Sequence, residues 1–208
     1  LFIPETIGSI SYLSKNLEKC KKNIFAGFVL TCLGNDSNFS YLESRCGDTV
    51  ADKIVLNANP SKETGTLKFI SEKYGNQSII QSLDCKKVDL NKREYTVMIN
   101  SGMQDSNVDP LIYAKDALLD GAGEILINSI DNDGGLLGYD LDLIKRISKD
   151  INCPLIALGG AGSWQHMLDL FNITNISAAC TQNIFHFTEQ SILSAKKFLK
   201  FNKIKIRN

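Results

Sequence analysis

The sequence alternates short apolar runs with segments of helical periodicity, and this alternation restricts the fold more than any other feature. Strands separated by single helices indicate βαβ units, and therefore a parallel sheet. The apolar runs are continuous rather than interrupted by polar residues, which is typical of strands covered on both faces. Strands are predicted at Leu1–Ile3 (a remnant), Ile24–Thr31, Lys53–Asn57, Ser78–Leu83, Glu124–Asn128, Pro154–Leu158 and Ile176–Cys180.

The segments between these strands carry helix start signals. Asp109 precedes Pro110, and Asp140 and Ser163 each precede apolar residues at helical spacing, so these three polar residues are predicted N-caps. Further helices are predicted over Ile10–Cys20, after Asn59-Pro60 with Leu67, Ile70 and Tyr74 on one face, and from Thr188.

One connection is too long and too polar for a plain loop. Residues 86–101 read KKVDLNKREYTVMINS, and we expect them to contain a hairpin with Tyr95–Ile99 as one arm. Long connections after strands of parallel sheets are often functional.

Composition limits the classes of partner. Lys plus Arg and Asp plus Glu number 23 each among 208 residues, so net charge favours neither nucleic acid nor a membrane surface. No apolar run approaches the roughly 20 residues that span a bilayer. The six cysteines form no CxxC pair. We therefore expect a single domain over residues 1–208 that is reduced and cytoplasmic, with no metal and no cofactor.

Nearly every predicted strand ends in polar residues or glycine. Because ligands of parallel α/β proteins bind at the carboxyl ends of strands, these residues predict a ligand site at that edge of the sheet. They are Asn57, residues 84–86, Asn128, Ser129, Asp131, residues 133–135, residues 159–162, Thr181, Gln182 and Asn183.

The run Gly159-Gly160-Ala161-Gly162 ends a buried strand directly before the predicted N-cap Ser163. Glycine lets backbone N–H groups approach an anion closely, and a helix N-terminus adds positive potential. With Asp133-Gly134 and Asn183 at neighbouring strand ends, we expect a phosphate site. The alternative is a tight turn, in which glycine is also frequent.

Asp84 and Asp131 are candidates for acid/base chemistry, because a carboxyl group in a shielded cavity can be tuned for proton transfer. For Asp131 the alternative is a local turn within DNDGG. The two histidines, His166 and His186, are interpreted as structural.

Residues 121–162, GAGEILINSIDNDGGLLGYDLDLIKRISKDINCPLIALGGAG, resemble the cyclase subunit of imidazole glycerol phosphate synthase. Further matches are ADKIVLN (51–57), LDCKK (83–87) and IFHF (184–187), whereas residues 100–116 are more similar to relatives from surface-sugar gene clusters that make amidino sugars. The resemblance implies a (β/α)8 TIM barrel and a lyase of histidine biosynthesis. It also implies a glutaminase partner at the amino-terminal barrel face, whose ammonia crosses the barrel to a bisphosphorylated ribulosyl substrate.

Residue by residue, the resemblance implies catalytic roles for Asp84 and Asp131. It implies substrate or phosphate binding by Asn57, Ser101, Asp133, Gly134, Gly159, Gly160, Gln182 and Asn183. Lys53 and Glu124 match two members of the charged ammonia gate, and Asp52 matches a residue of the glutaminase interface. An internal echo, VADKIVLNANP (50–60) against GAGEILINSID (121–131), pairs the two gate residues.

The sequence also departs from the family pattern. The first strand with its C-L-D-x-x-x-G run is absent, so we expect a barrel lacking its first strand–helix unit: either a fragment or a protein without one general acid. Thr31–Asn35 replaces a G-G-G turn at the first phosphate site, and Asn132 replaces an arginine. Three functions stay open: an ammonia-using cyclase, a non-catalytic partner-binding subunit, and a sister sugar-phosphate isomerase.

Overall fold

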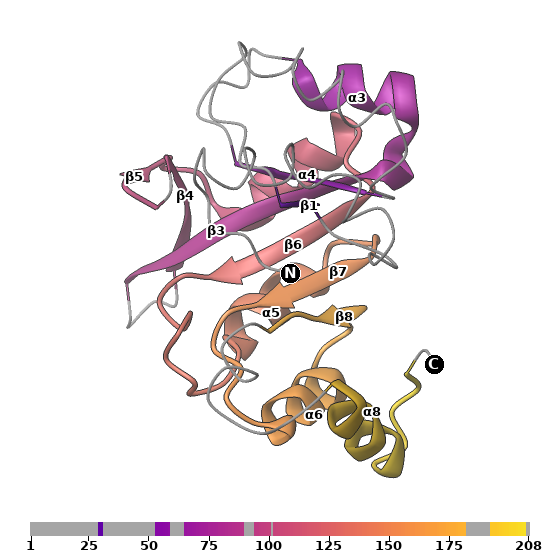
Figure 1. Cartoon of the computed structure of the whole chain (residues 1–208). Coiled ribbons are helices and arrows are strands. Elements are labelled where there is room, and N and C mark those ends of the chain that lie inside the picture. The colour runs from indigo at the N-terminus through magenta and orange to yellow at the C-terminus, as the bar shows by residue number, and fades with distance from the viewer. Residues whose placement is uncertain are drawn as a thin grey trace, which may run out of the picture.

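The structure is a computed structural model and describes residues 29–30, 53–58, 65–89, 94–100, 102–181 and 192–206. Its centre is a parallel sheet in the order β1-β2-β3-β6-β7-β8 (Figure 1). The strands are β1 (Val29–Leu30), β2 (Ile54–Asn57), β3 (Ile79–Asp89), β6 (Glu124–Ser129), β7 (Leu155–Leu158) and β8 (Ala178–Ala179). The predicted parallel sheet is confirmed. The predictions at Leu1–Ile3, Ile10–Cys20, Asn59-Pro60 and Thr188 lie outside the described residues.

The predicted hairpin is confirmed, but its first arm corrects the predicted end of a strand. β3 does not stop at Leu83; it continues to Asp89 and pairs antiparallel with β4 (Glu94–Ile99), which pairs in turn with β5 (Gln104–Asp105). The first half of β3 pairs with β2 and β6, and the second half exchanges β2 for β4. This change of partner keeps the polar residues after Leu83 in the sheet.

Helices follow the parallel strands, and three of them begin where the sequence predicts. The helices are α3 (Thr66–Tyr74), α4 (Pro110–Leu119), α5 (Leu141–Ser148), α6 (Trp164–Ile173) and α8 (Ile192–Phe201). The side chains of Asp109, Asp140 and Ser163 accept hydrogen bonds from the backbone N–H groups of the first turns of α4, α5 and α6. All three predicted N-caps are therefore confirmed, whereas the N-cap of α3 is Gly65, which has no side chain to accept a hydrogen bond.

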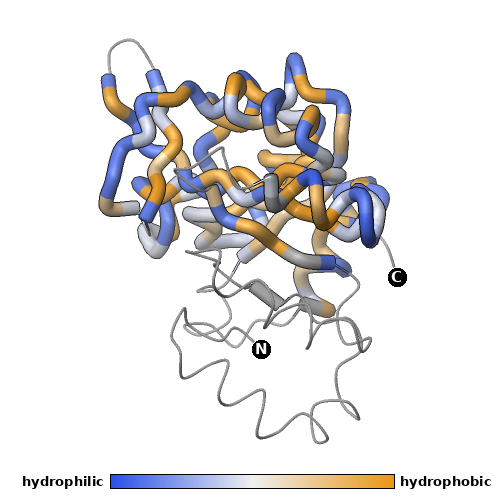
Figure 2. The backbone as a smooth tube through the Cα atoms, turned by 90° about the horizontal axis from the view of Figure 1, so that it is seen from above, coloured by the Kyte–Doolittle hydropathy of each residue, from blue (hydrophilic) through white to orange (hydrophobic). Residues whose placement is uncertain are grey.

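The two faces of the sheet differ in what covers them. On one face, strand residues such as Ile125, Ile127 and Leu155 pack against α4, α5, α6 and α8 in one large buried cluster. On the other face, Val55, Ile80, Leu126 and Ile156 form a cluster of strand residues alone. We call this second face the inner face. Figure 2 shows that hydrophobic and hydrophilic residues alternate along the backbone of the described part of the chain.

Asp140 links the hairpin to α5, which gives a first prediction. Its Oδ1 accepts from the backbone N–H of Leu143 at 3.1 Å and from the hydroxyl of Tyr95 in β4 at 3.0 Å. Loss of an N-cap costs about 0.5–2 kcal/mol and loss of one hydrogen bond about 0.5–1.5 kcal/mol. D140A should therefore lower the free energy of unfolding in urea more than Y95F, which removes the hydroxyl alone. Equal losses of unfolding free energy in D140A and Y95F would contradict the capping role of Asp140.

Candidate functional site

The inner face is layered from the amino ends to the carboxyl ends of its strands. Because side chains alternate along a strand, the residues at every second position share this face. Lys53 and Glu124 lie at the amino ends, the apolar cluster occupies the middle, and Asn57, Asp84 and Asn128 lie at the carboxyl ends.

The carboxylate of Asp84 is held between two amide groups from the neighbouring strands. Nδ2 of Asn57 in β2 donates to Oδ2 at 3.0 Å, and Nδ2 of Asn128 in β6 donates to Oδ1 at 2.8 Å. The Asn57 amide is itself oriented, since its Oδ1 accepts from the backbone N–H of Ala58 at 2.9 Å. Each carboxylate oxygen thus has one fixed donor and keeps lone pairs for a further partner.

The structure brings together two predicted site residues, Asn57 and Asp84, and adds a third that was noted only as a strand end. Asn128 pairs with Asp84 in the parallel register of β3 and β6. The internal echo contains a signal for it, because the alignment that pairs Lys53 with Glu124 also pairs Asn57 with Asn128.

Asp131 lies in the loop after β6 and reaches the hairpin. Its Oδ2 accepts from the backbone N–H of Lys87 in β3 at 2.8 Å, and its side chain is exposed. The N–H groups of Asn132 and Asp133 bond to the carbonyl of Ser129, so the DNDGG segment is a turn. The second candidate carboxylate therefore lies at the same edge of the sheet as Asp84.

The glycine-rich run packs against the loop after β6. Gly159 and Gly160 are buried and have φ values of +96° and +94°. The N–H of Gly138 donates to the carbonyl of Gly160 at 2.7 Å, and a Cβ on Gly160 would lie 2.1 Å from the carbonyl oxygen of Gly138. A Cβ on Gly162 would lie equally close, 2.1 Å, to the carbonyl oxygen of Leu136. Backbone packing alone requires these glycines, and phosphate binding at this turn stays a prediction.

The remaining predicted ligand residues fall into two groups. Asp133 and Gly134 are exposed in the loop after β6, which packs on the glycine-rich run. Ser101, Gln182, Asn183 and Asp52 lie outside the described residues. His166 is in α6, as predicted, and its Nδ1 accepts from the N–H of Gly162 at 3.1 Å.

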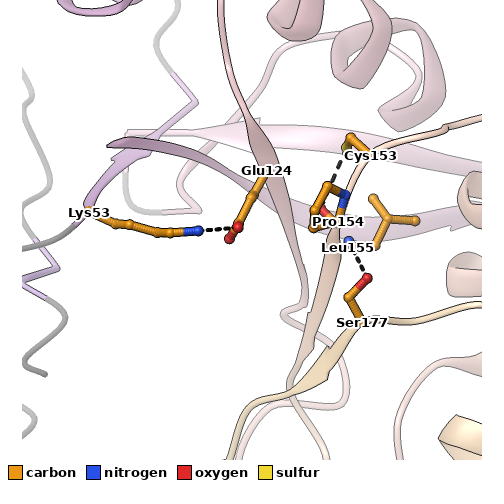
Figure 3. A network of polar contacts seen from close by, with 6 residues as sticks. All are labelled: Lys53, Glu124, Cys153, Pro154, Leu155 and Ser177. Atoms are coloured by element: carbon orange, nitrogen blue, oxygen red, sulfur yellow. Dashed lines mark hydrogen bonds and ion pairs between the residues drawn. The ribbon is translucent and has the colours of Figure 1, made fainter. Parts of the chain in front are cut away.

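At the opposite end of the inner face, Lys53 and Glu124 form an ion pair, with Nζ bonded to Oε1 (Figure 3). The two side chains are 30% and 17% exposed, so the pair is only partly hidden from solvent. Beside it, the backbone N–H of Leu155 donates to Oγ of Ser177 and ties β7 to the start of β8 (Figure 3). The two predicted gate residues are thus in direct contact.

The three cysteines of the described segments, Cys85, Cys153 and Cys180, are free thiols. Burial raises the pKa of all three thiols, and the nearby carboxylate of Asp84 raises the pKa of Cys85 further. Only the thiolate is alkylated, and a raised pKa lowers the thiolate fraction at a given pH.

We therefore expect slow alkylation by iodoacetamide at pH 8, with Cys153, the most exposed of the three, modified first and the fully buried Cys85 last. The rate at Cys153 should keep rising with pH above the ordinary thiol pKa, because its own pKa is higher. Peptide mass spectrometry measures each site, and urea should make the three rates converge. Equal rates at Cys85 and Cys153 in the folded protein would contradict the burial.

Two classes of feature are absent from the part of the chain that the structure describes. No group of three or more His, Cys, Asp and Glu side chains there could hold a metal ion. None of the helices there has both the length and the apolar character needed to cross a membrane.

Three curated proteins similar to this chain share one name. The "Imidazole glycerol phosphate synthase subunit HisF" of Hydrogenobaculum sp. (strain Y04AAS1) is 40% identical over 157 residues, which cover 76% of this chain and 62% of that protein. The same-named proteins of Chlorobium luteolum and Streptococcus mutans are 41% and 35% identical over 76% of the chain, covering 61% and 62% of their own lengths. The chain thus spans about three fifths of these relatives.

Two family models match the chain. The model of a domain of unknown function, DUF4910, matches residues 1–81, most of which lie outside the described residues. The model described as "Histidine biosynthesis protein" matches residues 42–191 and so covers the whole of the site. Members of that family are TIM barrels, and the parallel sheet with helices on its outer face matches one side of such a barrel. The chain therefore belongs to the histidine biosynthesis protein family.

Proposed function

We propose that the chain acts as an ammonia-using cyclase, a lyase of the imidazole glycerol phosphate synthase type. The observation that carries the proposal is the inner face itself. It places a carboxylate, Asp84, between two amides at the carboxyl ends of the strands and a charged pair, Lys53 and Glu124, at the amino ends. The similar curated proteins, named as subunits of imidazole glycerol phosphate synthase, support it.

The reaction needs proton transfer at the carboxyl-end edge. Ammonia attacks a keto carbon of a phosphorylated ribulosyl substrate, and water leaves to form an imine. The imine nitrogen then closes the imidazole ring, and a C–N bond of the substrate breaks as the departing fragment takes a proton and leaves as an amine. Asp84 moves the proton at one side of the reacting carbon, and Asp131 is the second carboxylate at that edge. The alternative substrate is that of the amidino-sugar relatives: a sugar nucleotide on which the same ammonia chemistry acts.

Phosphate groups of the substrate bind at the turns around this edge. Backbone N–H groups of Gly159 and Gly160, next to the N-terminus of α6, bind one phosphate together with Gly134 in the adjacent loop. Asn57 contacts the substrate beside Asp84. The remaining proposed contacts are Ser101, Asp133, Gln182 and Asn183.

Ammonia enters from the opposite face. A glutaminase partner docks there in contact with Asp52 and releases ammonia toward Lys53 and Glu124. The ion pair closes the passage when it is formed, and its separation lets ammonia reach the apolar middle of the inner face. In this proposal residues 1–208 form one barrel domain that lacks the first strand–helix unit. The enzyme is cytoplasmic, and its partners include neither nucleic acid nor a membrane.

A second function is favoured by one sequence feature. Thr31–Asn35 has a single glycine, Gly34, where the family pattern has a G-G-G phosphate-binding turn, which favours a subunit that binds the glutaminase without turnover.

The experiment compares three conditions with the bisphosphorylated ribulosyl substrate: ammonium chloride, glutamine with a glutaminase, and no nitrogen source. The cyclase forms product in the first two conditions only. Glutaminase binding without product in any condition would establish the binding subunit, and turnover without nitrogen would establish an isomerase.

A further inference from the structure

The amide of Asn128 has its nitrogen and oxygen in contrasting environments. Nδ2 donates to Oδ1 of Asp84 at 2.8 Å. Oδ1 of Asn128 is buried and has no hydrogen-bond partner among the described residues. An unsatisfied buried acceptor is unfavourable, so another interaction must stabilise the amide in this orientation.

The carboxylate of Asp84 is what orients this amide. Turning the Asn128 amide over would place its oxygen against the Asp84 oxygen, which is also an acceptor, and would remove a charge-assisted hydrogen bond. The side chain therefore keeps its N–H groups on Asp84 although its oxygen stays unsatisfied.

The glycine-rich turn leaves room for this arrangement. Strand pairing places Asn128 between Asp84 in β3 and Leu158 in β7, directly before Gly159. A Cβ on Gly159 would lie 3.2 Å from Oδ1 of Asn128 and 2.6 Å from the carbonyl oxygen of Ser129. The absence of a side chain at Gly159 thus lets the turn close over the Asn128 amide without displacing it.

From this geometry we propose that Asn128 is a positioning residue for Asp84, a role that rests on the proposed acid/base function of Asp84. With Asn57 on one oxygen and Asn128 on the other, the carboxylate cannot rotate freely about its Cβ–Cγ bond. The remaining lone pairs of the Asp84 carboxylate therefore stay oriented toward the reacting carbon. Because Asn128 acts through Asp84, it affects the chemical step and leaves substrate binding intact.

The test is the variant N128A, with N172A as a matched control that removes an exposed asparagine of α6. With ammonium chloride and the bisphosphorylated ribulosyl substrate, N128A should lower kcat by about 10–100-fold, the order expected when a reacting group is misplaced by about 1 Å. KM should change by less than about twofold, because the positioning role concerns only the transition state. N172A should match the wild type in both constants.

A second measurement keeps the test decisive if N128A loses its fold. In D84A, hydrogen exchange of the Asn128 side-chain amide, followed by NMR, should be at least about tenfold faster than in the wild type, because the protecting hydrogen bond is gone. An unchanged exchange rate, or an unchanged kcat in folded N128A, would overturn the positioning role. Full activity of D84A would instead overturn the function proposed for Asp84, so the two failures are distinguishable.

Discussion

Replacing Asp84 by asparagine should lower kcat by about 10²–10⁴-fold, the range expected when an acid/base group is lost. Asparagine has nearly the same shape, and its side-chain oxygen can still accept a hydrogen bond from Asn57 or Asn128. The site therefore keeps its packing and loses the carboxylate that we propose moves the proton.

The measurement is steady-state turnover with ammonium chloride, which removes any effect on a glutaminase. D120N, an identical change just after α4 and away from the site, is the control and should retain wild-type kcat. A D84N enzyme whose kcat stays within about twofold of the wild type would show that Asp84 transfers no proton in the slow step.

The second large effect concerns stability at the glycine-rich turn. Gly160→Ala should lower the free energy of unfolding for two reasons. An alanine in the left-handed backbone conformation costs about 1–3 kcal/mol, and steric overlap of its Cβ costs about 1–3 kcal/mol more. Its φ is +94° and its new Cβ would meet the carbonyl oxygen of Gly138 at 2.1 Å. Because that carbonyl belongs to the backbone of another loop, it cannot move aside as a flexible side chain does.

Two other glycines separate the two causes. Gly65→Ala adds only backbone strain, since its φ is +55° and nothing lies within 4 Å of the new Cβ. Gly162→Ala adds only overlap, with the carbonyl oxygen of Leu136 at 2.1 Å. Urea unfolding should rank Gly160→Ala as the most destabilising of the three. A Gly160→Ala protein as stable as Gly65→Ala would contradict the close approach of the two loops.

Local signals in the sequence predict most of the fold. The caps at Asp109, Asp140 and Ser163 were correctly predicted because an N-cap depends on residues within one turn. The predicted end of β3 at Leu83 was wrong because the strand continues by exchanging one neighbour for another. The sequence predicts the hairpin arm at Tyr95–Ile99, but the polar residues Lys86 and Lys87 interrupt the apolar pattern by which the partner strand is recognised, so its extension to Asp89 was missed.

A residue of the candidate site could be predicted from the sequence where its own type and position indicate its chemistry. Asp84 and Asn57 could be proposed as site residues because each lies at the end of an apolar run, and the structure places the two side chains in contact. The role of Asn128 depends on the lateral register of β3 and β6, which periodicity along one strand does not contain. The run at 159–162 allowed two interpretations, an anion site and a tight turn. Its packing on Gly138 shows that the turn requirement alone explains Gly160.

Transfer of ammonia nitrogen to a phosphorylated substrate can be followed most directly with 15N-labelled ammonium chloride and mass spectrometry of the product. With the bisphosphorylated ribulosyl substrate and the complete protein, we predict one 15N atom in the imidazole product of the wild type and in that of D120N. D84N should give almost none in the same time. Product that contains no 15N, or a wild type that forms no product while still binding inorganic phosphate in 31P NMR, would contradict the ammonia-using function.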